Sequence, residues 1–102
     1  MEYTPGTRWK SAVCDTEVVI VSAPTLPVWL KCGGHDVIAL AEEKPSNVAL
    51  DPASADGSLI GKRYVHDASG LEVLCTKGGQ GTLSVDGKAL SLKGAKPLPS
   101  SD

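Results

Sequence analysis

The dipeptide Asp86-Gly87 constrains this chain more than any other short stretch, because it separates two runs of alternating residues. Asp-Gly readily adopts the positive φ angles of a type I′ turn, whose twist matches that of paired strands. Residues 82–85 and 88–92 flank the dipeptide, so they are predicted to form a β-hairpin. A three-residue loop with Gly87 in the left-handed conformation would shift the pairing by one residue, so the register stays open.

A second hairpin is predicted just before the first. Residues 62–66 and 71–76 are joined by Asp67-Ala68-Ser69-Gly70, in which the glycine supplies the positive φ that such a turn often needs. Side chains alternate along a strand, so Leu71, Val73 and Cys75 are expected to share one apolar face. Residues 64–92 are therefore interpreted as a compact antiparallel meander with Cys75 near its centre.

The first half of the chain also indicates strands. Residues 18–21 are uniformly apolar, which predicts a central strand buried on both faces, and Pro24 and Pro27 require a loop after it. Residues 28–32 alternate between apolar and other side chains and end at Gly33-Gly34, after which residues 36–40 are expected to return as a short strand.

Helical periodicity is missing, because Pro45 stops the short run of helix formers that precedes it. Residues 45–56 are expected to form a long surface loop. The pattern predicts an all-β domain over residues 1–96, built as a small antiparallel barrel or sandwich of about seven short strands with no substantial helix. Residues 97–102 are predicted to be an extended Pro/Ser tail, and no internal repeat is evident.

Composition excludes some classes of function. The net charge is −2, and neither half carries the dense basic face that binding to nucleic acid requires. No stretch resembles a signal peptide or is long enough to span a membrane, so we expect a cytoplasmic protein without a membrane partner. Three cysteines is an odd number, which argues against a disulfide framework and for reduced thiols or metal ligands.

Cys14, Cys32, His35 and Cys75 make up a Cys3His set, a ligand complement that binds zinc in tetrahedral geometry. Cys32-Gly-Gly-His35 has ligand spacing of the right kind and resembles the knuckles of zinc-ribbon and rubredoxin-like domains. That resemblance covers these four residues and implies a small β structure that binds zinc or iron.

Two other interpretations of the cysteines stay open. Cys32 and Cys75 are in phase with Leu30 and Val73, as buried core residues would be. Cys14 is the best candidate for a reactive thiol, because the following Asp15-Thr16 indicates a strand end near water.

The chain lacks paired carboxylates, a nucleophile motif and a cofactor fingerprint, which favours a non-enzymatic role. The leading hypothesis is an accessory or protein-interaction module that binds a larger protein, such as a small subunit of an enzyme complex. Trp29 and Leu98 are the predicted partner contacts, because each presents an exposed apolar side chain. A zinc- or iron-binding protein and a small ligand-binding or thiol-dependent protein are the alternatives.

Overall fold

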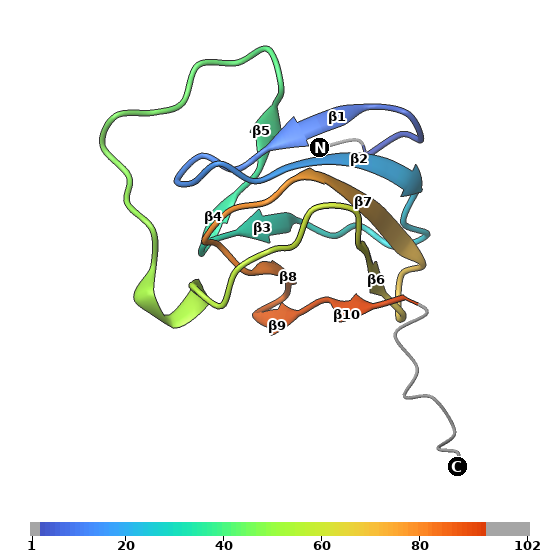
Figure 1. The fold of residues 1–102 in the computed structure, drawn as a ribbon. Coiled ribbons are helices and arrows are strands. Elements are labelled where there is room, and N and C mark those ends of the chain that lie inside the picture. Colours follow the sequence, from blue (N-terminus) through green and yellow to red (C-terminus); the bar gives the residue numbers. More distant parts are fainter. Residues whose placement is uncertain (1–2, 94–102) are drawn as a thin grey trace.

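A computed structural model of the chain describes residues 3–93 as two antiparallel sheets packed face to face (Figure 1). The prediction of a small all-β domain is confirmed, and the sheets form a sandwich because neither closes into a barrel. The strands are β1 (Arg8–Lys10), β2 (Glu17–Ser22), β3 (Leu30–Cys32), β4 (His35–Asp36), β5 (Ile38–Ala39), β6 (Arg63–His66), β7 (Leu71–Lys77), β8 (Leu83–Val85), β9 (Lys88–Ala89) and β10 (Ser91–Leu92), with one 3-10 turn, η1 (Pro52–Ser54).

The two halves of the chain follow the same path through these sheets. The six-stranded sheet has the order β10-β6-β7-β2-β1-β5 and the four-stranded sheet the order β4-β3-β8-β9, so β1 to β5 correspond in turn to β6 to β10. Registers agree as well: Trp9 pairs with Val18 as Tyr64 pairs with Val73. The expectation of no internal repeat is therefore wrong, since the repeat lies in strand path and pairing while most residue identities differ.

Both predicted hairpins are present. Asp86 and Gly87 have φ angles of 54° and 78°, and Val85 pairs with Lys88, so the turn has two residues and the open register is resolved. The interpretation of residues 64–92 as one meander is wrong, because β6 and β7 belong to the six-stranded sheet whereas β8 and β9 belong to the other. The chain crosses between the layers after β7.

Two predicted strands each divide between the sheets. Residues 36–40 contribute to β4, which pairs with β3, and to β5, which pairs with β1; residues 88–92 divide in the same way into β9 and β10. The chain changes layers at Val37 and Leu90, and both side chains are buried in the core. A bend at a buried residue thus yields more strands than the alternation indicated.

The expectation that residues 18–21 are buried on both faces is also wrong. Val18 and Ile20 point into the core, whereas Val21 is 36% exposed. A two-layer sandwich covers only one face of each sheet, so even an apolar strand retains a second face near solvent.

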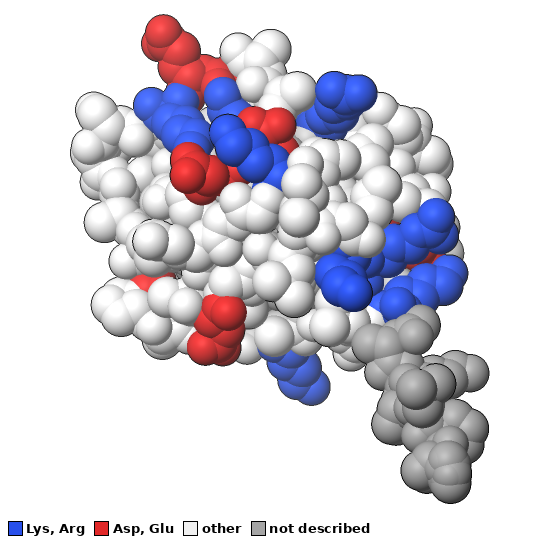
Figure 2. All heavy atoms as spheres, in the orientation of Figure 1, with Lys and Arg blue, Asp and Glu red and all other residues white. Residues whose placement is uncertain are grey.

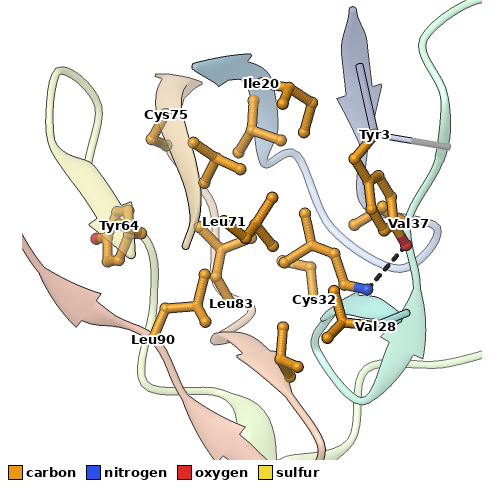
Figure 3. Close-up of a cluster of buried hydrophobic side chains, with 14 residues drawn as sticks. Tyr3, Ile20, Val28, Cys32, Val37, Tyr64, Leu71, Cys75, Leu83 and Leu90 are labelled. Atoms are coloured by element: carbon orange, nitrogen blue, oxygen red, sulfur yellow. Dashed lines mark hydrogen bonds between the residues drawn. The ribbon is translucent and has the colours of Figure 1, made fainter. Parts of the chain in front are cut away.

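The core fills the space between the sheets (Figure 3). It is mostly aliphatic, and the largest fully buried side chains include Ile20, Leu30, Leu71 and Leu83. Tyr3 closes one end, where its hydroxyl accepts a hydrogen bond from the Leu30 amide at 2.8 Å. Among residues 3–93, every buried side-chain nitrogen or oxygen has a hydrogen-bond partner.

A long loop links the two halves, as predicted for residues 45–56. It is largely exposed and contains only η1, at which the Asp51 side chain accepts a hydrogen bond from the Ala53 amide at 3.0 Å. The predicted tail, residues 97–102, lies outside the described residues. Within the described part of the chain, no helix is long and apolar enough to cross a membrane.

Candidate functional site

Cys14 and Cys32 meet at the end of the sandwich where the first half of the chain contacts the crossing segment after β7. Their sulfur atoms lie 3.9 Å apart. Cys32 is the last residue of β3 and points into the core, and Cys14 lies in the turn between β1 and β2. Two of the four predicted metal ligands are therefore neighbours, although 18 residues separate them along the chain.

The turn that carries Cys14 is held by Ser11. The Ser11 hydroxyl accepts hydrogen bonds from the amides of Val13 and Cys14, both at 3.1 Å, and the Ser11 amide donates to the Thr16 carbonyl at 2.9 Å. Serine side chains commonly stabilise turns in this way. These local hydrogen bonds hold the backbone of the turn that carries Cys14.

Polar groups surround the Cys14 sulfur. The Gly81 amide donates to the sulfur at 3.3 Å, and the Cys14 thiol donates to the Thr16 hydroxyl oxygen at 3.3 Å. Partial burial raises the pKa of Cys14, but hydrogen bonds from Ser11, Thr16 and Gly81 outweigh burial and lower the pKa to about 7. Hydrogen bonds that favour the charged form have this effect, so Cys14 is substantially a thiolate at neutral pH.

Cys32 has the opposite environment. Its side chain is fully buried, and burial followed by the nearby charge of Cys14 raises the pKa of Cys32 to about 12. Cys32 therefore stays a neutral thiol. One sulfur of the pair is nucleophilic and partly accessible, while the other is protonated and enclosed.

Glycines allow the backbone to approach both sulfurs. A Cβ atom at Gly81 would lie 2.8 Å from the Gly33 amide nitrogen and 2.9 Å from the Cys32 sulfur. Gly33 has a φ of +67°, and a Cβ there would lie 2.6 Å from the Leu50 side chain. Gly81 therefore packs directly against the thiol pair.

The other two predicted ligands, Cys75 and His35, form hydrogen bonds to backbone carbonyl groups. The Cys75 thiol donates to the Lys77 carbonyl at 3.2 Å, and a ring nitrogen of His35, Nε2, lies 2.9 Å from the Ala49 carbonyl oxygen. No group of three or more His, Cys, Asp and Glu side chains within residues 3–93 is arranged to hold a metal ion. The Cys3His zinc or iron site stays a prediction, which metal analysis of the purified protein would test.

Ser11, Thr16 and Gly81 were not predicted as site residues. Ser11 and Thr16 are close to Cys14 in sequence, and a serine three residues before a cysteine is a weak sign of a turn that presents the thiol. Gly81 contacts Cys14 from 67 residues away, and only the folded topology brings these residues together.

Of the two predicted partner contacts, one is described. Trp29 is 51% exposed and borders a hollow of about 430 Å³ that is also lined by Lys31, Asp36 and the Asp86-Gly87 turn. Leu98 lies outside the described residues. On the face shown in Figure 2, a broad uncharged surface separates small groups of charged side chains.

No family model, curated protein or solved structure matches this chain.

Proposed function

We propose that the protein is a thiol-dependent redox module in which Cys14 and Cys32 form a reversible disulfide. The observation that carries the proposal is the contact between a hydrogen-bonded Cys14 sulfur and a buried Cys32 sulfur at 3.9 Å. A disulfide requires about 2.05 Å between the sulfur atoms. A shift of the short turn between β1 and β2 would bring them to that distance.

The oxidant class that fits this pair is a small hydroperoxide, because a low-pKa thiolate attacks the O–O bond readily. The Cys14 thiolate forms an S–O bond as the O–O bond breaks, and the leaving alkoxide or hydroxide takes a proton from solvent. The Cys32 sulfur then attacks the Cys14 sulfenic acid, the S–O bond breaks, and the Cys32 proton leaves with the hydroxyl group as water. Two thiols and one hydroperoxide thus yield a disulfide, an alcohol or water, and a second water.

The internal repeat supports a functional role for the pair. The position equivalent to Cys14 in the second half is Ser69, and the position equivalent to Cys32 is Val85. A turn at the equivalent position and an equivalent inward-facing strand therefore form without thiols, so the strand path does not require them. Cys75, by contrast, corresponds to the core residue Ile20, which favours the core interpretation of Cys75.

The experiment is oxidation of the reduced protein with hydrogen peroxide, followed by intact mass and thiol titration. We expect the mass to fall by about 2 Da as two hydrogens leave, and dithiothreitol to restore it. Cys14→Ser and Cys32→Ser should each abolish the change, whereas Cys75→Ser, the matched control, should retain it. Loss of two thiols in Cys14→Ser, with the same fall in mass, would contradict the proposal.

A second candidate is the protein-interaction module that binds a larger protein. It is supported by Trp29, which is 51% exposed beside a hollow on the four-stranded sheet. Copurification from the native host should yield a stoichiometric partner, and Trp29→Ala should weaken that complex without unfolding the domain. Leu26→Ala is the control, because Leu26 is 50% exposed but borders a different hollow. Equal binding by both variants would contradict this candidate.

A further inference from the structure

Two hydroxyl groups behind Cys14 form a buried pair that the disulfide chemistry does not itself explain. The oxygens of Thr16 and Ser58 lie 2.5 Å apart, and the residues are only 1% and 4% exposed. Thr16 in turn lies 3.3 Å from the Cys14 sulfur. The three side chains form a continuous hydrogen-bonded line from the interior to the reactive sulfur.

Ser58 is fixed in this line by its backbone. It forms an isolated antiparallel bridge with Gly79, in which the Ser58 amide donates to the Gly79 carbonyl at 2.9 Å and the Gly79 amide donates back at 3.2 Å. A Cβ at Gly79 would lie 2.5 Å from the Thr16 hydroxyl oxygen. Glycine at this position therefore lets Thr16 and Ser58 approach each other closely.

The hydroxyl protons of Thr16 and Ser58 determine how this chain of hydrogen bonds responds when Cys14 loses its proton. Each hydroxyl has one proton, so the 2.5 Å contact holds a single hydrogen bond in one of two directions. When Cys14 is a thiol it donates to Thr16, and Thr16 donates to Ser58. When Cys14 is a thiolate, Ser58 donates to Thr16 and Thr16 donates to the sulfur. Hydrogen bonds in such chains polarise one another, so Ser58 strengthens the bond from Thr16 to the thiolate.

We propose that Ser58 is a positioning residue that acts through Thr16 to stabilise the Cys14 thiolate. This inference rests on the proposed redox function and identifies how the reactive sulfur is kept ionised. The other titratable groups around Cys14 are Asp15, which follows it in the chain, Cys32, Cys75 and Lys44. The Lys44 ammonium group donates to the Cys14 carbonyl oxygen at 2.5 Å. Of these groups, Cys75 also interacts with Ser58, because burial raises the pKa of Cys75 and a hydrogen bond from the Ser58 side chain partly offsets that rise. The Cys14 peptide is therefore the one whose alkylation is followed.

The test is the pH dependence of Cys14 alkylation by iodoacetamide, measured by peptide mass spectrometry in the full chain. Ser58→Ala should move the midpoint upward by about one pH unit, which lowers the rate at pH 7 about fivefold. Ser58→Thr, which keeps the hydroxyl, should restore the wild-type profile. Ser69→Ala is the matched control, because Ser69 has a buried hydroxyl in the equivalent turn of the second half, and its midpoint should not move.

Equal midpoints in Ser58→Ala, Ser69→Ala and the wild type would overturn the inference. If Ser58→Ala does not fold, Thr16→Val and Thr16→Ser provide the same contrast, and only the valine variant should shift the midpoint. Equal midpoints in that pair would also overturn the inference. A separate result would reject the proposed function itself: a wild-type protein that forms no Cys14–Cys32 disulfide with peroxide. An unchanged pH profile with normal disulfide formation would reject the role of Ser58 alone.

Discussion

At the scale of single residues, burial and hydrogen bonding give two neighbouring cysteines different chemistry. The Cys14 thiolate is stabilised by hydrogen bonds from Ser11, Thr16 and Gly81, whereas Cys32 is enclosed by the core. The alternation of residues 28–32 correctly predicted an inward-facing Cys32, and the polar residues after Cys14 correctly indicated a less buried thiol. Their contact could not be predicted, because sequence periodicity describes each strand without its neighbours.

The burial of Cys32 leads to a prediction about stability. Cys32→Val should change the free energy of unfolding by less than about 1.5 kcal/mol, because valine occupies the equivalent buried position Val85. Cys32→Ser should cost about 1 to 3 kcal/mol, since it replaces a thiol by a more polar hydroxyl in the buried core. Urea unfolding of the reduced proteins measures both. A serine variant as stable as the valine variant would show that the site admits water.

The lowered pKa of Cys14 also makes stability depend on pH. The pKa of Cys14 in the folded protein is about 7, below its ordinary value of 9.0. The stabilisation of the fold by the Cys14 thiolate is therefore fully present above pH 9 and is lost as the pH falls through 7. The reduced wild type should therefore become more stable from pH 7 to pH 9, and Cys14→Ser should lack that increase. The buried thiols act in the opposite sense, because their raised pKa values destabilise the fold only as the pH rises above 9. Urea unfolding at several pH values provides the comparison, and an identical pH slope in the variant would contradict this assignment.

At the scale of elements, the long loop between the halves is tied to the thiol pair. Lys44 donates to the Cys14 carbonyl, and the Asp51 amide donates to the Gly33 carbonyl at 2.9 Å. The sulfur atoms must approach from 3.9 Å to about 2.05 Å to form a disulfide. We expect that movement to shift the backbone beside both attachment points of the loop.

Oxidation should therefore loosen residues 41–57. We expect faster amide hydrogen exchange in this loop in the disulfide form than in the reduced form. The turn at residues 67–70, which belongs to the other half, should exchange at the same rate in both forms and is the internal control. Unchanged exchange in the loop would mean that the disulfide closes without disturbing it.

Which hairpins form could be predicted from turn chemistry, because Asp86-Gly87 and Gly33-Gly34 both supply positive φ angles. The sheet that each strand joins could not be predicted from the sequence. The strands after both hairpins bend at a buried residue and cross to the other layer, and nothing in a strand of two residues identifies its partner. The amino-acid sequences of the two halves share only short similarities, such as Gly-x-Arg followed by an aromatic residue, which is Trp9 in the first half and Tyr64 in the second.

At the scale of the whole molecule, the two halves share one core. β2 pairs with β7 at the centre of one sheet, and β3 pairs with β8 at the centre of the other. Neither half buries its apolar face alone, because each supplies one side of both central pairs. The thiol pair and the Gly81 amide meet where the halves join, so the complete site exists only in the folded whole.

This sharing predicts a single unfolding transition. Urea denaturation followed at Trp9 by fluorescence and at Tyr64 by NMR, one probe in each half, should give coincident curves. Two separated transitions would show that the halves are independent units. The control is Trp29→Ala, which removes an exposed tryptophan and should leave the transition detected at Trp9 in place.

The disulfide connectivity of the oxidised protein tests the Cys14–Cys32 pair most directly. Trypsin cleaves after Lys10, Lys31, Lys62, Arg63 and Lys77, which places Cys14, Cys32 and Cys75 on the separate peptides 11–31, 32–62 and 64–77. After treatment with hydrogen peroxide and digestion without reductant, we expect peptides 11–31 and 32–62 to be joined within one molecule and peptide 64–77 to remain free. A disulfide that includes Cys75, or a Cys14 oxidised to sulfinic acid beside an unreacted Cys32, would contradict the proposed Cys14–Cys32 disulfide.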